Sequence, residues 1–418
     1  MPIEGGDILS KENLAKYFTA TATKYISAVE INKSRSDQHE FNGVASIKQI
    51  LGSENLLNVP TKFIYLSDEE SDARIDSGTI SWYDARKNKP SRSAEFRLYY
   101  SENMALNEAN EGDLLVIALR PDKSVMIIVA KSETSIENKL LWLFGTAETT
   151  FKINTNLASK SVNYNTRFIL RELGVNVEQE IEPVVIEDMI KKFGNKFPTT
   201  SVFSAFCRET LPFEPSYNPD KAIVRWLERE ELLFRMFEKH LLQDQISSGF
   251  KDIDEFINMA KSVLNRRKSR VGLCFENHLH QIFKDKEIRF SEQVITENNA
   301  RPDFVFPDIR YYHLIPQFKD LKELVTILGA KYSCKDRWRQ VLSEARFVDQ
   351  KYVITYERGI SNSQTSEMQA HKLQLVVPKG IQETYTKDQQ GWLLSLDDFI
   401  DQLRQRQSKI YAMSIPIK

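Results

Sequence analysis

The chain has 418 residues, of which 41% are hydrophobic and 11% aromatic, so it can form two or three domains with separate cores, and extended disorder is excluded. Its formal net charge is only -1, so a polyanionic partner must be bound by local basic segments such as 265–270 and 334–339 rather than by the whole surface. The three cysteines form no CxxC pair, which argues against a disulfide framework or thiolate zinc site and fits a reducing cytoplasm. We find no signal-peptide pattern and no run of about 18 apolar residues, so no membrane span is expected.

Residues 1–170 are predicted to form a strand-rich domain. Short β-branched or aromatic runs, separated by turn residues, occur at 24–31, 58–66, 78–85, 94–100, 113–119 and 124–130. Only IKQILG at 47–52 indicates a short helix. Several strands without long helices predict a small antiparallel barrel or sandwich.

Residues 171–195 are more charged and are the predicted linker, with one possible helix at 185–193. From residue 196 to 418 the pattern changes. Long helical periodicities at 221–242 and 253–283 are followed by short apolar runs at 288–295, 302–307, 324–333, 351–356 and 373–378, with a helical pattern at 336–348. This order predicts an α/β domain with a mixed sheet.

Two residues in the second domain suggest a chemical site. Asp303 follows Pro302 at the predicted start of one strand, and Lys331 lies near the end of a later strand. An aspartate that holds a divalent metal and a lysine that orients water and offsets developing charge are the residue types that phosphodiester hydrolysis needs. Taken singly, such residues are usually surface charges.

A second acid commonly stands two residues before such a lysine, but here that position is Gly329. Residues 335–346 are predicted to form an amphipathic helix with Trp338, Val341, Leu342 and Ala345 on one stripe, and Glu344 lies beside that stripe. Glu344 can therefore lean back over the strand end and replace the missing acid. Glu276, on the long helix before the Asp303 strand, is a further candidate.

Three segments together resemble the EcoRII-type restriction endonucleases: RPDFVFP, AKYSCKDRWRQVLSEA and INMAKSVLNRRKSRVGLCFENHLHQIF. The resemblance implies an N-terminal all-β B3-like pseudobarrel that binds a second, effector copy of the DNA site, followed by an α/β PD-(D/E)XK nuclease domain with a mixed central sheet. It also implies a cytoplasmic homodimer of the type IIE kind. Such an enzyme cuts double-stranded DNA at CC and GG around a short centre (CCWGG or CCNGG), with Mg²⁺ and no nucleotide cofactor.

The resemblance also implies roles for individual residues. The catalytic set is Asp303, Lys331, Glu344 and Glu276, with Asp303 and Glu344 as metal ligands. Base readout falls to Lys335, Asp336 and Arg337, whose donors and acceptor suit guanine and cytosine. Arg225 and Trp226 are the candidates for base flipping. Effector DNA is expected to be bound by Lys33, His39, Lys89, Arg92, Glu95 and Arg97. Ser91 stands where the family has a lysine, which leaves the effector contacts open.

Other interpretations stay open beside this one. The base-reading triplet could be a solvated ion pair at a helix start, and Arg225 and Trp226 could be a surface charge and a packing residue. Tyr312 is a less favoured nucleophile for a recombinase-type mechanism. The basic segment 265–270 could contact phosphates or be a solvated turn. The whole protein could instead be a DNA-binding regulator with a decayed nuclease domain, or a modification-dependent nuclease.

Overall fold

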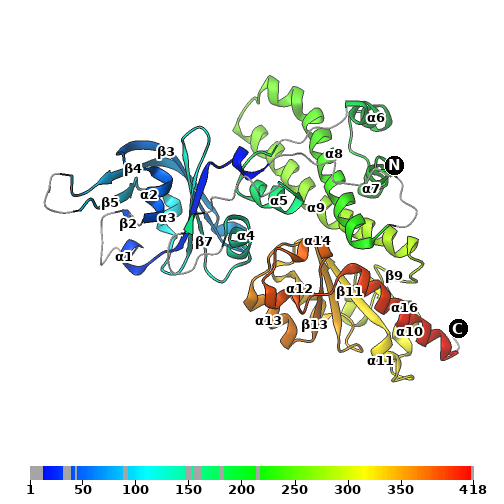
Figure 1. Ribbon diagram of the computed structural model, residues 1–418. Coiled ribbons are helices and arrows are strands. Elements are labelled where there is room, and N and C mark those ends of the chain that lie inside the picture. Colours follow the sequence, from blue (N-terminus) through cyan, green and yellow to red (C-terminus); the bar gives the residue numbers. More distant parts are fainter. Residues whose placement is uncertain are drawn as a thin grey trace, which may run out of the picture. The chain divides into compact units, whose positions relative to one another are not determined.

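The computed structural model describes residues 13–31, 39–42, 45–87, 93–145, 152–153, 162–177, 183–212 and 217–415. They divide into two compact units (Figure 1). The N-terminal unit comprises Met1–Val177 with Arg358–Ser363 and Thr384–Thr386, and the C-terminal unit comprises Glu178–Glu357, Gln364–Glu383 and Lys387–Lys418. Within the described part of the chain, no helix is both long and apolar enough to cross a membrane.

The N-terminal unit is built on one eight-stranded sheet with the order β2-β5-β4-β3-β7-β6-β1-β8. The strands are β1 (Ala20–Tyr25), β2 (Glu40–Asn42), β3 (Leu56–Leu66), β4 (Arg74–Asp84), β5 (Phe96–Tyr100), β6 (Leu114–Leu119), β7 (Val125–Ala130) and β8 (Lys152–Ile153). Neighbouring strands are antiparallel except for the parallel pair β3 and β7. The strand-rich prediction is confirmed, whereas the B3-like pseudobarrel stays a prediction.

Both faces of this sheet are covered, which explains the uninterrupted apolar sequences of β6 and β7. Alternate residues of β7 belong to different cores, with Ile127 in one and Ile128 in the other. The first core includes residues of α2 (Ala45–Leu51) and α3 (Met104–Asn107), and the second includes residues of α4 (Ser135–Phe144) and α5 (Tyr164–Glu172). Shorter helical elements are η1 (Leu14–Lys16), α1 (Ala28–Ile31) and η2 (Glu70–Asp72).

Two predictions for this unit were wrong. The helix at 47–52 exists as α2 but is not alone, because α4 and α5 cover the second sheet face, where a charged sequence such as SIENKLLWLF still carries one apolar side. The run 24–31 is not a strand, since β1 ends at Tyr25 and α1 follows. Its β-branched residues favoured the strand prediction, but a short apolar run does not distinguish a strand from a helix.

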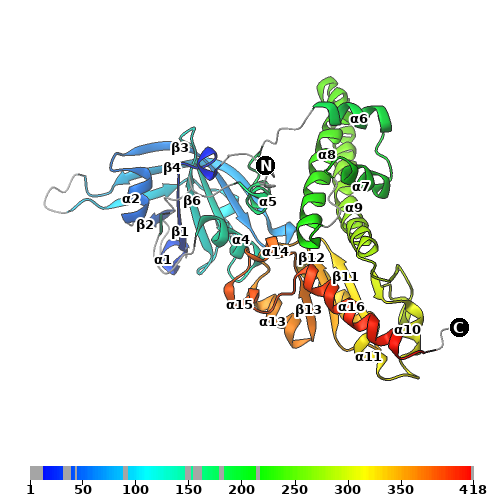
Figure 2. The same ribbon diagram turned by 45° about the vertical axis from the view of Figure 1, so that its right-hand side comes forward.

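The C-terminal unit begins with a helical layer. It consists of α6 (Pro183–Phe193), α7 (Thr200–Glu209), α8 (Pro219–Ser248) and α9 (Ile253–Asp285), and α8 and α9 lie side by side as the two long predicted helices (Figures 1 and 2). Val185 and Met189 of α6 pack with phenylalanines of α7 and α8. The second half of the segment predicted as a linker is therefore part of a core.

The rest of this unit is a five-stranded mixed sheet with the order β13-β12-β11-β10-β9, as predicted. The strands are β9 (Ser291–Glu292), β10 (Phe304–Phe306), β11 (Thr326–Lys331), β12 (Lys351–Thr355) and β13 (Leu373–Val376). Strands β9 to β11 are antiparallel and β11 to β13 are parallel. The remaining helical elements are η4 (Glu297–Asn299), α10 (Ile309–Leu314), α11 (Leu321–Leu324), η5 (Lys335–Arg337), α12 (Trp338–Ser343), α13 (Asn362–Ala370), α14 (Lys379–Gln382), α15 (Lys387–Gln390) and α16 (Leu396–Ala412).

Aromatic contacts fix the long helices on this sheet. Phe283 of α9 meets Phe304 and Phe306 of β10 edge-on, and Phe399 of α16 meets Phe306 and Tyr352 of the same face. The opposite face carries Val305 and Ile327, which belong to a core with α10 and the turn after α12. The start of β10 and the end of β11 thus lie between the helical layer and α12.

Candidate active site

Asp303 and Lys331 meet where β10 begins and β11 ends. Asp303 immediately precedes β10, and Lys331 is the last residue of β11. One Asp303 carboxylate oxygen, Oδ2, accepts hydrogen bonds from Lys331 Nζ at 2.8 Å and from the Ala330 backbone N–H at 2.7 Å. Both side chains are mostly shielded from water, with 12% and 15% of their surfaces exposed. The predicted aspartate–lysine pair is therefore formed, and it is fixed by the main chain as well as by charge.

Gly329 is a consequence of how α12 packs on β11. The pairing of Phe304 with Leu328, continued by one residue, puts Asp303 opposite Gly329. A Cβ atom at residue 329 would lie 2.4 Å from Cγ2 of Val341, which is fully buried in α12. The helix approaches the strand so closely that no side chain, acidic or otherwise, fits at that position.

Glu344 comes from the same helix but not from within it. The predicted helix over 335–346 is shorter than expected, because η5 and α12 together end at Ser343 and Glu344 adopts an extended backbone as the C-terminal cap. Ala345 then has a positive φ of 53°, which turns the chain away from the helix axis. The side chain of Glu344 is buried, and its Oε2 atom has no hydrogen-bond partner.

The electrostatics place Glu344 with the Asp303–Lys331 pair. The pKa of Glu344 is raised to about 7, chiefly by burial and also by the charge of Asp303, while Lys331 and Lys351 act in the opposite direction. A buried carboxyl with an unpaired oxygen and a raised pKa is a frequent sign of a functional site. The predicted replacement of the missing acid by Glu344 is compatible with this position.

Glu276 of α9 is the third acid of the group. Its pKa is raised to about 7, chiefly by burial and then by the charge of Asp303, against the lowering effect of Lys331. Gln293 Nε2 donates to Glu276 Oε2 at 3.0 Å. Three acids, Glu276, Asp303 and Glu344, thus face one lysine, Lys331. They are drawn from a stretch of 69 positions in the sequence.

These residues fit a hard divalent cation. Mg²⁺ prefers oxygen ligands and is commonly bound through one or two carboxylates, with water and phosphate oxygens completing the shell. Asp303 and Glu344 supply two such carboxylates, and the unpaired Oε2 of Glu344 is a free acceptor. Within the described ranges no group of three His, Cys, Asp or Glu residues is arranged to hold a metal ion by itself.

The charged triplet after Lys331 forms η5, which begins four residues beyond the lysine. Lys335 has a positive φ of 33°, and Asp336 and Arg337 are exposed. Asp336 pairs with Arg339, a residue that sequence reasoning did not single out, and Arg337 donates to the Ser333 carbonyl at 2.7 Å. The triplet is thus presented at the surface beside the acidic group.

Arg225 and Trp226 occupy different environments on α8. Arg225 is exposed, whereas Trp226 is half-buried, with its ring 5.3 Å from that of Tyr217 and 5.7 Å from that of His278. The Arg208 guanidinium lies 5.6 Å from the Trp226 ring centroid. These contacts give Trp226 a packing role in this conformation.

Tyr312 of α10 is fully buried. Its hydroxyl donates to Glu297 Oε2 at 2.5 Å and accepts from the Phe347 backbone N–H at 3.4 Å. Burial, followed by the bond to Glu297, raises the pKa of Tyr312 well above its ordinary value. A buried, neutral phenol of this kind is a poor nucleophile, which supports the packing interpretation.

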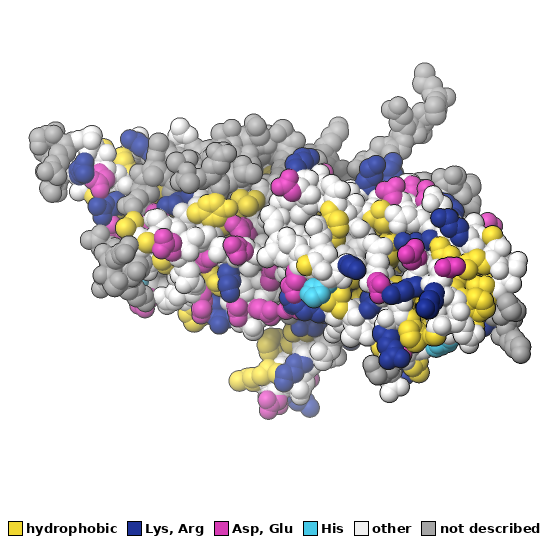
Figure 3. Space-filling model, turned by 90° about the horizontal axis from the view of Figure 1, so that it is seen from below, with side chains coloured by type: hydrophobic (Ala, Val, Ile, Leu, Met, Phe, Trp, Pro, Cys, Tyr) yellow, Lys and Arg dark blue, Asp and Glu magenta, His cyan; other side chains and the backbone are white. Residues whose placement is uncertain are grey.

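The arginines of the basic segment 265–270 mostly have internal partners. Arg266 lies over the ring of Phe197, Arg267 Nε donates to Glu238 at 2.8 Å, and Arg270 pairs with Glu230. Figure 3 shows Lys and Arg side chains interspersed with Asp and Glu on the face drawn, rather than gathered into one basic surface. Phosphate binding by this segment stays a prediction, and these partners make it less favoured.

In the N-terminal unit, Glu95 and Arg97 belong to one half-buried network with residues of β2 and β4. Arg97 donates to Glu40 at 2.7 Å and to Glu95 at 2.9 Å, and Tyr83 donates to Glu40 at 2.5 Å. The bond to Arg97 lowers the pKa of Glu95. His39 packs edge-on against Tyr100, while Lys33, Lys89 and Arg92 lie outside the described residues.

Two residues near the acids were missed by sequence reasoning. Gln293 orients Glu276, and Lys351, at the start of β12, donates to the Leu342 carbonyl at 2.5 Å, at the end of α12 beside Glu344. Nothing in the local sequence marks either residue, because a lysine beginning an apolar strand is ordinarily exposed. Only the pairing of β11 with β12 brings Lys351 to the site.

Comparison with known proteins supports the C-terminal part of this picture. Residues 234–400 match the family described as EcoRII C terminal, and this range contains Lys331 and the three acids around it. The chain is 38% identical over 189 residues to the type II restriction enzyme EcoRII of Escherichia coli, and this match covers 45% of the chain and 46% of that enzyme. The chain thus spans about half the length of that relative. The resemblance to EcoRII-type restriction endonucleases is confirmed for this region.

Two solved structures are also similar. One is metal-depleted Ecl18kI in complex with uncleaved, modified DNA, at 17% identity and a TM-score of 0.42, covering 55% of this chain and 85% of that one. The other is the complex of the restriction endonuclease PspGI with substrate DNA, at 15% identity and a TM-score of 0.39, covering 54% and 92%.

Proposed function

We propose that this protein is a type II restriction endonuclease of the EcoRII kind, because residues 234–400 match the EcoRII C-terminal family. It hydrolyses double-stranded DNA in a Mg²⁺-dependent reaction at a site with CC and GG around a short centre. The observation that carries the proposal is the Asp303–Lys331 pair, fixed by the Ala330 N–H and flanked by the buried Glu344 and the half-buried Glu276, both of raised pKa.

In this proposal Asp303 and Glu344 hold the Mg²⁺ ion, which supplies charge neutralisation at the scissile phosphate. Lys331 donates to the attacking water and orients it toward phosphorus, and its positive charge offsets the negative charge that develops on the phosphoryl oxygens. The water oxygen bonds to phosphorus and releases a proton to solvent, the bond to the leaving oxygen breaks, and that oxygen takes up a proton from solvent. Glu276, held by Gln293, supports the site from α9.

The neighbouring triplet accounts for the sequence preference in this proposal. Lys335 and Arg337 donate to guanine O6 and N7, and Asp336 accepts from cytosine N4. The exposure of Asp336 and Arg337 at η5 supports this role, because base edges are reached only by side chains free to enter a groove. The Asp336–Arg339 pair must open or be shared when DNA binds.

For the N-terminal unit we propose binding of a second, effector copy of the site. The network of Glu40, Tyr83, Glu95 and Arg97 supplies partly exposed donors and acceptors on and beside three neighbouring strands. Two-fold symmetry of the target is best met by a homodimer, so we propose that two copies cut the two strands of one site.

The test is cleavage by the full-length chain of a plasmid with several CC/GG sites, in Mg²⁺ and then in EDTA. We expect discrete fragments with Mg²⁺ only. Lys331→Ala should abolish cutting but keep site-specific DNA binding in Ca²⁺, whereas the matched control Lys322→Ala, on exposed α11, should cut like wild type.

Two outcomes would contradict the proposal. If wild type yields no discrete fragments on any plasmid, the DNA-binding regulator is favoured; if Lys331→Ala cuts at the wild-type rate, the assigned chemistry is wrong. Comparing methylated with unmethylated plasmid separates the modification-dependent alternative, which predicts cutting only of the methylated DNA.

A further inference from the structure

The first half of α9 carries an apolar stripe that nothing in the described part of the chain covers. Ile253, Ile257 and Leu264 are 75%, 37% and 53% exposed, and Ala260 lies between them. Their spacing of four, three and four residues puts all four on one side of the helix. A stripe with this period on an exposed helix is typical of a surface that packs against another helix.

The spacing identifies the partner. The intervals four, three and four read the same in both directions, so a second copy of α9 running antiparallel presents the same stripe. Ile253 then faces Leu264 of the second copy, and Ile257 faces Ala260, whose small side chain lets the helices approach closely. Such an arrangement has a two-fold axis and closes as a dimer.

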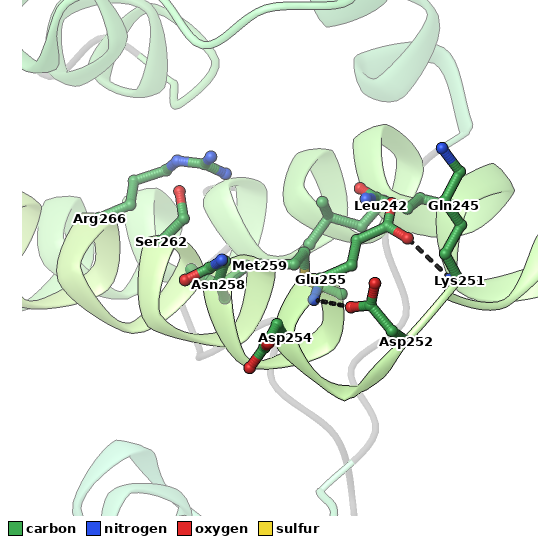
Figure 4. A pocket seen from close by; sticks show the side chains of 11 residues that line it. Leu242, Gln245, Lys251, Asp252, Asp254, Glu255, Asn258, Met259, Ser262 and Arg266 are labelled. Carbon is green, nitrogen blue, oxygen red and sulfur yellow. Dashed lines mark hydrogen bonds between the residues drawn. The ribbon is translucent and has the colours of Figure 1, made fainter.

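The charges beside the stripe fit the same arrangement. Asp254 and Lys261 are seven residues apart, on the same flank of the stripe, and both are exposed. Neither side chain forms an ion pair among the residues that the structure describes. Asp254 is one of the residues that line a pocket of about 630 Å³ between α8 and α9, and Figure 4 shows its carboxylate directed away from Leu242 and Gln245, the two α8 residues of that lining. In the antiparallel pair Asp254 of each copy lies next to Lys261 of the other, which gives two ion pairs.

We propose that this stripe is an interface between two copies of the chain, formed by antiparallel packing of α9 around Ile257 and Ala260. The occupant is a second copy rather than another protein, because both the apolar spacing and the charges are complementary to themselves.

The dimer formed through α9 differs in geometry from the homodimer proposed to cut a single DNA site. This comparison rests on the proposed function. Glu276 lies about 26 Å along α9 from the centre of the stripe, so the two Glu276 residues would lie about 50 Å apart. Five base pairs span only about 17 Å. The α9 pair therefore joins catalytic units that act on separate DNA copies.

The test measures the mass of the full-length protein by light scattering over a range of concentrations without DNA. At a concentration where wild type is associated, we expect Leu264→Glu to have half its mass. Asp254→Lys and Lys261→Asp should each weaken association by about tenfold, since two ion pairs become repulsive. The double variant with both changes should recover wild-type association to within about threefold, since opposite charges again face each other.

The control is Leu273→Glu, because Leu273 is also half-exposed on α9 but lies on the opposite side of the helix from the stripe. It should keep the wild-type mass. The proposal is overturned if Leu264→Glu keeps that mass, or if the double charge swap associates no better than the single variants. Neither result depends on cleavage, so a failure of the proposed function is seen separately in the plasmid assay.

Discussion

Substitution of Gly329 by alanine tests whether the close contact of α12 with β11 sets the position of the second acid. The new methyl carbon would lie 2.4 Å from Cγ2 of Val341, whereas carbon atoms in contact are about 3.5–4.0 Å apart. Val341 cannot yield easily, since it is fully buried and its β-branched side chain strongly prefers one rotamer in a helix. Overpacking of this kind costs about 1–3 kcal/mol of folding free energy.

The same substitution should lower activity more than it lowers the folded population. If α12 moves outward by about 1 Å to relieve the contact, Glu344 moves with it, and a misplacement of that size costs about 100-fold in rate. We expect urea denaturation to show the stability loss, and cleavage measured under conditions where the variant is fully folded to show the rate loss.

Combining Gly329→Ala with Val341→Ala tests whether the stability loss comes from the clash between these two side chains. Val341→Ala removes two buried methyl groups and by itself costs about 1.6 kcal/mol in transfer free energy, plus a cavity term. In the double variant the methyl group at residue 329 occupies the vacated space, so the combined loss should be about 1–2 kcal/mol smaller than the sum of the single losses. The control is Gly272→Ala, in the middle of α9 with open space around the added Cβ, which should raise stability by about 0.5–1 kcal/mol.

The reasoning is refuted if Gly329→Ala is as stable and active as wild type. It is also refuted if the losses of Gly329→Ala and Val341→Ala simply add. Either result would mean that Glu344 is not positioned by this contact.

Three further predictions concern single residues. Glu344→Gln should be inactive yet stabilise the metal-free protein, because the folded pKa of Glu344 is about 7 against an ordinary 4.5. The free-energy cost of its charge is absent below pH 4.5, grows between pH 4.5 and 7 and is fully present above pH 7. Denaturation above pH 7 should therefore show a gain of about 2–3 kcal/mol in the free energy of unfolding. Arg337→Ala should lose about 1–3 kcal/mol of discrimination against a changed G·C pair, measured as the ratio of cleavage rates on the two sequences, and unchanged discrimination would remove Arg337 from base readout. Arg97→Ala should leave cutting of single-site DNA unchanged without added effector but weaken stimulation by an added CC/GG duplex by at least about fivefold; equal stimulation would contradict effector binding by the Arg97 network.

Much of the fold could be predicted from the sequence because its signals are local. The long helices at 221–242 and 253–283 show their 3.6-residue period directly, and five of the six strand runs of the first domain coincide with strands. The failures are where local preference is weak. The run 24–31 reads as a strand but splits between β1 and α1, and α4 forms only because the second face of the sheet must be covered.

The sequence by itself determined which chemical groups are available: Asp303 before a strand, Lys331 at the end of another, and acids at Glu276 and Glu344. Residue types and their order along the chain are enough for that, because the chemistry needs particular groups. Tertiary structure alone decided that these groups meet, since Asp303 and Lys331 are joined by strand pairing across 28 positions. It also decided why Gly329 is a glycine: the reason is the depth to which Val341 of α12 packs against β11, a distance in space that no local pattern records.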